Sequence, residues 1–133
     1  MDTLRNPHGF TPRCSVVIST RHRPAQLEKC LEAVARLEYP RFEVMVVDSA
    51  PSDSRAREVA ERWGTGYILE PVPGASRARN RGARASISEI VASLDDDAMP
   101  EPGWLSGLVR EFEDPMVMAV GGRIPRAPGG GPR

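Results

Sequence analysis

Three consecutive carboxylates, Asp95, Asp96 and Asp97, follow a largely apolar run at residues 90–94. If this run is a buried strand, the three side chains gather like charges at the rim of a sheet. Two such charges about 5 Å apart repel by roughly 3 kcal/mol at an effective dielectric constant near 20. A divalent cation removes that repulsion, and Mg2+ and Mn2+ prefer hard carboxylate oxygens as ligands. The triplet therefore predicts a divalent metal site, with a solvated acidic turn that caps the next helix as the alternative.

The hydrophobic pattern alternates short strands with helices. Apolar and β-branched runs predict strands at residues 15–20, 42–47, 67–69, 90–94 and 117–120. Helical spacing, capping residues and breakers predict helices from Pro24 to about residue 37, from Asp53 or Ser54 to Trp63, at residues 76–85 and at residues 104–112. The small residues Ala78, Gly82 and Ala85 predict that the third helix packs closely against the sheet.

This alternation predicts an α/β fold. Parallel strands joined by right-handed crossovers form an open, mostly parallel sheet with helices on both faces. Ligands of such sheets bind beyond the carboxyl ends of the strands, at the point where the strand order reverses. Polar residues stand at those ends: Thr20 and Arg21, Asp48, and the Asp95–Asp97 triplet.

The predicted third helix also begins at this edge, and its first turns carry Arg77, Arg79 and Asn80. A helix N-terminus with arginines binds a diphosphate well, because free N–H groups and guanidinium groups both donate hydrogen bonds to it. Carboxylates, arginines and a helix N-terminus therefore converge on one edge. The arrangement suits a metal-bound nucleoside diphosphate.

Other nucleotide sites are missing their defining residues. The sequence has no Gly-x-x-x-x-Gly-Lys-Ser/Thr, which excludes a P-loop. Residues 20–24 (TRHRP) join the first strand to the first helix without a glycine, which argues against a dinucleotide site. A phospho-receiver domain needs acidic residues after the first strand and a lysine late in the chain, whereas Lys29 is the only lysine.

Composition predicts one domain at residues 14–125, between a flexible N-terminus at residues 1–13 and a Gly/Pro-rich tail at residues 126–133. The net charge of zero gives no reason to expect a nucleic-acid partner. The arginine bias is typical of a GC-rich bacterial genome. Cys14 and Cys30 lack metal-ligand spacing and are expected to be reduced core residues. With no apolar signal core and no stretch of membrane-spanning length, we expect a cytoplasmic protein.

Five segments, in this order and spacing, resemble glycosyltransferase family 2. They are residues 17–21 (VISTR), 42–48 (FEVMVVD), 74–82 (GASRARNRG), 94–97 (LDDD), and 102–105 (PGWL) followed by 120–122 (VGG). Each is weak alone, but together they cover roughly residues 14–125. The resemblance implies the GT-A fold, in which an Asp-x-Asp motif holds a divalent metal on the diphosphate of a nucleotide sugar.

The resemblance also assigns roles residue by residue. Asp48 would bind the base, and Asp95 would face the ribose. Asp97 would ligate Mn2+ or Mg2+, with Asp95 as a further ligand. The remaining nucleotide-binding residues implied by the resemblance are Thr20, Arg21, Arg79, Asn80 and Asp96.

Several of these residues have a plainer interpretation. Asp48 can cap the turn at residues 49–51, and Asn80 can bond backbone near the helix start. Arg77, Arg81 and Arg84 recur at helical spacing, which is typical of a solvated face. Arg79 points away from that stripe, so it is the better candidate for ligand binding.

The acid that would deprotonate the acceptor has no clear counterpart in this chain, so the catalytic base is unknown. We therefore expect a chain that is incomplete at its C-terminus and forms the donor-binding half of a transferase. One hypothesis is sugar transfer from a nucleotide diphosphate donor to an unidentified saccharide, lipid or small-molecule hydroxyl. The other is a nucleotide-binding remnant, or a half that needs a partner chain. An uncovered edge near residues 117–120 would favour self-association.

Overall fold

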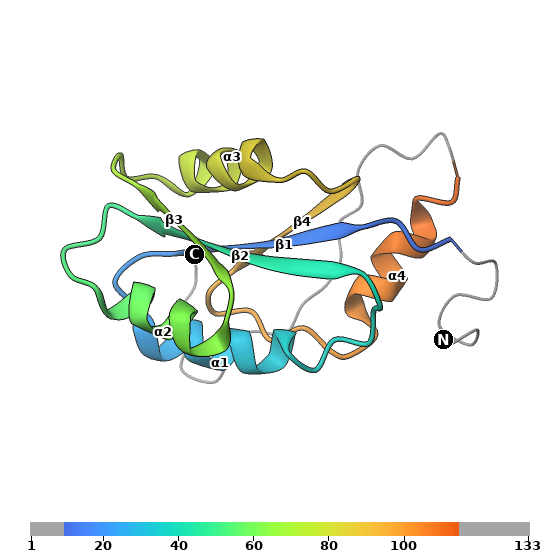
Figure 1. Cartoon of the computed structure of the whole chain (residues 1–133), viewed down its shortest axis with the longest axis horizontal. Helices are drawn as coiled ribbons and strands as arrows, with labels where there is room; N and C mark the ends of the chain where they lie inside the picture. Colours follow the sequence, from blue (N-terminus) through green and yellow to red (C-terminus); the bar gives the residue numbers. More distant parts are fainter. Residues whose placement is uncertain (1–9, 115–133) are drawn as a thin grey trace.

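The computed structural model describes residues 10–114, which form a layered α/β domain (Figure 1). Strands and helices alternate along the chain, as the hydrophobic pattern predicts. Their boundaries differ from the predicted ones by one to a few residues. In chain order the elements are β1 (Cys14–Thr20), α1 (Pro24–Val34), β2 (Phe42–Ser49), α2 (Arg55–Trp63), β3 (Gly66–Glu70), α3 (Ala75–Ala85), β4 (Ile90–Asp95) and α4 (Trp104–Glu111).

The four strands form one parallel sheet in the order β3-β2-β1-β4. The chain builds outward from β1 through β2 to β3 and then returns to place β4 on the other side of β1. The point where the strand order reverses therefore lies between β1 and β4. Register brings Ser19 beside Asp95 and Thr20 beside Asp48. The predicted open parallel sheet is confirmed, and its ligand-binding crevice is expected at the carboxyl ends of β1 and β4.

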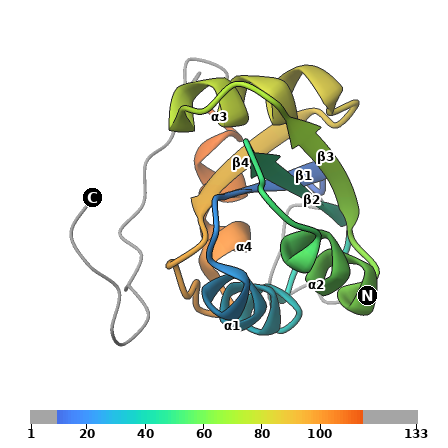
Figure 2. The same ribbon diagram turned by 90° about the vertical axis from the view of Figure 1, so that its left-hand side faces the viewer.

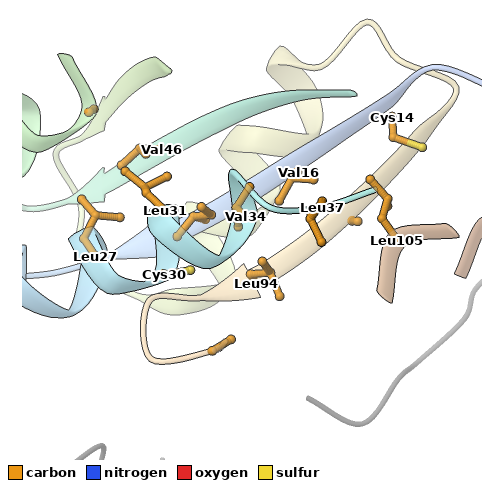
Figure 3. Close-up of a cluster of buried hydrophobic side chains, with 14 of the residues drawn as sticks. Cys14, Val16, Leu27, Cys30, Leu31, Val34, Leu37, Val46, Leu94 and Leu105 are labelled. Carbon is orange, nitrogen blue, oxygen red and sulfur yellow. The ribbon is translucent and has the colours of Figure 1, made fainter. Parts of the chain in front are cut away.

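Helices cover both faces of the sheet, as predicted. In the described part of the chain α3 lies on one face, and α1, α2 and α4 lie on the other (Figures 1 and 2). The larger core lies under α1, α2 and α4, where alternate strand residues such as Val16, Val46 and Leu94 meet Leu31 (Figure 3). The smaller core lies under α3. Two apolar layers thus fix the sheet from both sides and hold the carboxyl ends of its strands in place.

Helix α3 packs closely on the sheet because two small residues face it. Ala78 and Gly82 are buried, and a Cβ atom added at Gly82 would lie 2.3 Å from Cγ1 of Val17. The prediction that Ala85 shares this face is wrong: Ala85 is exposed. It is the last residue of the helix.

Residues 10–13, at the end of the segment predicted to be flexible, contact the folded domain. The Tyr39 hydroxyl donates to the carbonyl of Pro12, and Arg41 donates to the carbonyl of Thr11. The backbone N–H of Arg13 donates to Glu89. The predicted strand at 117–120, the glycine pair at 121–122 and the tail at 126–133 lie outside the described residues.

Both cysteines are free thiols buried in the larger core, as expected. Burial, as the largest cause, and the charges of Asp96, Asp97 and Asp95 together raise the pKa of the Cys30 thiol to about 12. Such a thiol stays protonated and behaves as a small apolar residue. No helix within residues 10–114 combines the length and the apolar character needed to cross a bilayer.

Candidate functional site

A pocket of about 240 Å³ opens at the carboxyl ends of the strands, where the strand order reverses. The ends of β1, β2 and β4, the loop after β1 and the start of α3 contribute to its wall. Its lining residues are Ser19, Thr20, Arg21, Arg23, Ser49, Gly74, Ala75, Ala78, Asp95 and Asp96. Four residues predicted from the sequence are among them: Thr20, Arg21, Asp95 and Asp96.

Two serine hydroxyls in this wall are buried without hydrogen-bond partners among the described residues. Ser19 ends the α3-facing side of β1, and Ser49 ends the same side of β2. The Oγ atoms of both have no partner within residues 10–114. A buried hydroxyl without a hydrogen bond costs about 1–3 kcal/mol, so these atoms are suited to bind a polar ligand in the pocket.

Asp96 is held in place by the first strand and the loop that follows it. Its Oδ2 accepts a hydrogen bond from Thr20 Oγ1 at 2.9 Å, and its Oδ1 lies 3.6 Å from Arg23 Nη1. Although it lines the pocket, the side chain is nearly fully buried. Asp96 therefore joins β4 to β1 across the reversal point and orients Thr20 and Arg23 at the pocket wall.

Asp95 and Asp97 differ in their access to the pocket. Asp95 is partly exposed and lines it, whereas Asp97 is 1% exposed and is absent from its wall. Within residues 10–114, no group of three or more His, Cys, Asp or Glu side chains is placed to hold a metal ion. One or two carboxylates still fit a cation such as Mg2+, which completes its shell with substrate phosphates and water.

The start of α3 faces the same pocket. Gly74 precedes the helix with φ of 137°, a conformation that favours glycine, and no side chain within residues 10–114 caps the first turn. Gly74, Ala75 and Ala78 line the pocket, so the first free N–H groups of the helix lie at its wall. Arg79 and Asn80 are exposed and outside the lining. Their predicted role in nucleotide binding stays a prediction.

Asp48 lies beside the pocket rather than in its lining. The carboxylate is 1% exposed; its Oδ2 accepts a 2.6 Å hydrogen bond from the Tyr67 hydroxyl, and its Oδ1 has no partner among the described residues. Burial raises the pKa of Asp48, while the Tyr67 hydrogen bond and the charge of His22 oppose that rise. A buried carboxylate with one free oxygen is poised to accept a ligand N–H.

The loops after β1 and β2 are joined beside Asp48. His22 Nε2 lies 3.2 Å from the carbonyl oxygen of Ala50. Both residues have positive φ angles, 55° for His22 and 42° for Ala50, which are unfavourable for residues other than glycine. Because Asp48 Oδ1 is buried, a ligand reaches it only if neighbouring groups move.

Sequence reasoning missed four polar residues of this region. Arg23, Ser19 and Ser49 line the pocket, and Tyr67 orients Asp48. Strand alternation could have identified the serines, because each lies two residues after a buried valine, Val17 or Val47, and so on the same face of its strand. Arg23 and Tyr67 carried no comparable signal, since their contacts depend on loop path and strand register.

The parallel sheet, the pocket at the reversal point and the carboxylates after β4 are the features expected of the GT-A glycosyltransferase fold. The family model described as "Glycosyl transferase family 2" matches residues 15–133. The chain belongs to glycosyltransferase family 2.

Two curated relatives come from Haloferax volcanii. Glycosyltransferase AglE is 34% identical over 121 residues, which cover 85% of this chain and 40% of the relative. Glucosyl-dolichyl phosphate glucuronosyltransferase is 42% identical over 120 residues, covering 84% of this chain and 38% of the relative. The chain thus spans about 40% of the length of these relatives.

A solved structure with the same fold is the mannosyltransferase PcManGT from Pyrobaculum calidifontis, in complex with GDP-Man and Mn2+. Its TM-score is 0.75 at 30% identity, with 82% of this chain and 34% of that chain covered. Glucosyl-3-phosphoglycerate synthase from Mycobacterium tuberculosis shares the fold at a TM-score of 0.64 and 22% identity, with 76% and 39% covered.

Proposed function

We propose that this chain binds a nucleoside diphosphate-sugar and supplies the donor site of a glycosyltransferase. The diphosphate would lie between the N-terminus of α3 and the carboxyl end of β4, with the base toward Asp48. The observation that carries the proposal is the pocket itself, which contains free helix N–H groups, a carboxylate and two unsatisfied serine hydroxyls. Arg21 and Arg23 add positive charge at its wall.

A divalent cation belongs to this proposal. Asp95 at the pocket wall and Asp97 two residues further on are the residues that would hold it, with the diphosphate and water completing its shell. Bound there, Mn2+ or Mg2+ would neutralise charge on the leaving diphosphate. The Mn2+ and the guanine nucleotide sugar in the mannosyltransferase neighbour support this choice of ligands.

The reaction proposed for the lineage is sugar transfer from the donor to an acceptor hydroxyl. A second function, donor binding without rapid transfer by this chain alone, is favoured by the composition of the pocket. Among the described residues its only carboxylates are Asp95 and Asp96. Glu70 accepts the N–H of Val72 and lies 3.9 Å from Arg81, so it is engaged outside the lining.

Coupled binding of metal and nucleotide tests the proposal. Because the protein supplies too few ligands for a cation alone, UDP or GDP should bind about 10-fold or more tightly with Mn2+ than with EDTA, measured by calorimetry. Asp95→Asn and Asp97→Asn, made separately, should reduce this metal-dependent gain while the fold is retained. The matched control is Glu61→Gln, an exposed acid on α2 outside the pocket. Equal affinity with Mn2+ and EDTA for wild type would overturn the proposal.

A further inference from the structure

The side chain of Asp48 is held from the neighbouring strand by Tyr67. Strand register pairs Tyr67 with Val46 and Leu69 with Asp48, so Tyr67 and Asp48 are diagonal neighbours on one face of the sheet. The Tyr67 hydroxyl donates to Asp48 Oδ2 at 2.6 Å. A diagonal contact of this kind needs a long side chain, and the tyrosine hydroxyl spans it.

The two oxygens of Asp48 are therefore unequal. Oδ2 accepts from Tyr67, whereas Oδ1 is buried and accepts nothing within residues 10–114. Burial raises the pKa of the Tyr67 hydroxyl, and its hydrogen bond to Asp48 raises it further, so this hydroxyl remains a donor. Asp48 is thus fixed as an acceptor with one free oxygen.

We propose that Tyr67 is a positioning residue that holds Asp48 through Oδ2 and leaves Oδ1 to accept a ring N–H of the donor's base. This inference rests on the proposed function and specifies the class of base. Uracil presents N3–H and guanine presents N1–H at the corresponding ring position. Adenine and cytosine present a lone pair there, which an ionised carboxylate repels. UDP and GDP are therefore the class of nucleotide that fits Asp48, in preference to ADP and CDP.

The charged and titratable groups around Asp48 come from β3 and from the loops after β1 and β2. Tyr67 belongs to β3, His22 to the loop after β1 and Asp53 to the loop after β2. The Tyr67 hydrogen bond and His22 lower the pKa of Asp48, whereas burial and Asp53 raise it. Arg57 on α2 acts on Tyr67. Removing only the tyrosine hydroxyl leaves His22, Asp53 and Arg57 unchanged. Their effects on the pKa of Asp48 therefore cancel when wild type is compared with Tyr67→Phe.

Tyr67→Phe tests the inference, because it keeps the partly buried ring and deletes the donor. Without that donor, the pKa of Asp48 should rise further above its usual value, since a hydrogen bond to the charged form is lost. Ionised Asp48 binds the base, so affinity falls as the pH drops through its pKa. The pH at which UDP or GDP affinity is half-lost should therefore move upward by about one unit in the variant.

Three controls separate this role from a structural one. Tyr39→Phe deletes another buried hydroxyl, which donates to Pro12 rather than to Asp48, and should leave the pH profile unchanged. Inorganic pyrophosphate with Mn2+ should bind wild type and Tyr67→Phe equally, because it lacks a base. In an Asp48→Asn background, which has no carboxyl at that position, Tyr67→Phe should shift no midpoint.

The carboxyl 13C titration of Asp48 gives a readout without ligand. A higher pKa in Tyr67→Phe, together with the shifted UDP or GDP profile, is the expected result. An unchanged Asp48 pKa, or a loss of affinity equal at every pH, would overturn the role of Tyr67 even if nucleotides bind wild type. If wild type binds none of UDP, GDP and pyrophosphate with Mn2+, the proposed function itself fails. If UDP and GDP bind no better than ADP and CDP, the base assignment fails alone.

Discussion

At the scale of single residues, the two carboxylate oxygens of Asp48 have different environments. Asp48→Ala removes the free Oδ1 together with the acceptor of the Tyr67 hydroxyl. A hydrogen bond to a charged group contributes about 1.5–3 kcal/mol, so UDP or GDP affinity should fall about 10- to 100-fold. Calorimetry with each nucleotide and Mn2+ measures the loss.

Inorganic pyrophosphate is the control for this prediction, because it occupies the diphosphate region and has no base. Its affinity should be the same for wild type and for Asp48→Ala. If the affinities for pyrophosphate and for the nucleotides fall by the same factor, Asp48 acts through the fold or through its charge, and a contact between Asp48 and the base is contradicted.

Residue positions at strand ends could be predicted, but their partners could not. Thr20 and Asp95 follow apolar runs, so their place at the carboxyl edge follows from the strand pattern. The contact between Tyr67 and Asp48 depends on the register of β3 against β2, which the sequence pattern leaves open. The ion pair between Arg23 and Asp96 depends on the conformation of the loop after β1, in which His22 has a positive φ. Contacts between side chains on different strands and loops therefore could not be predicted from the sequence and are known only from the structure.

At the scale of elements, the close packing of Gly82 against the sheet determines how near the N-terminus of α3 lies to the strands. In Gly82→Ala the new methyl group would lie 2.3 Å from Val17 Cγ1 and 3.2 Å from Val47 Cγ2, so helix or sheet must shift. Overpacking typically costs about 1–3 kcal/mol. Alanine's better helix propensity offsets up to about 1 kcal/mol of this. Urea unfolding should therefore show a net loss of stability, accompanied by weaker nucleotide binding as the helix N-terminus moves.

Gly107→Ala in α4 is the matched substitution, because no atom of the described residues lies within 4 Å of its added Cβ. It should keep or raise stability by up to about 1 kcal/mol, since only helix propensity changes. A Gly82→Ala variant as stable as Gly107→Ala would show that α3 does not rest on Val17 as described.

The order of elements was predictable from the alternation of strand and helix patterns, and the small face of α3 was largely so. Ala78 and Gly82 were correctly placed against the sheet, whereas Ala85 is exposed. Periodicity assigns a face but not where along the helix that face leaves the sheet. The strand order β3-β2-β1-β4 determines where the pocket lies. The right-handed rule for crossovers does not give this order by itself, because it does not say which strands are neighbours.

At the scale of the whole molecule, the proposed donor pocket contains, among the described residues, no carboxylate suited to deprotonate an acceptor. Asp96 is bound by Thr20 and lies beside Arg23, and Asp95 lies where a metal-bound diphosphate is proposed. Glu101 and Glu111 are exposed and outside the pocket lining. Residues 10–114 therefore contain the groups proposed to bind a donor, and they lack a positioned base.

The 133-residue chain by itself should consequently transfer sugar slowly or not at all. General-base catalysis typically contributes about 100- to 10,000-fold, and lost positioning of the acceptor lowers the rate further. Incubation with UDP- or GDP-sugars and Mn2+ should release nucleoside diphosphate at a slow rate that candidate saccharide or lipid acceptors do not increase. Rapid, acceptor-dependent transfer would contradict this prediction. It would place the base among Glu70, Glu101 and Glu111, and the Gln variant of each would then identify which carboxylate takes the acceptor's proton.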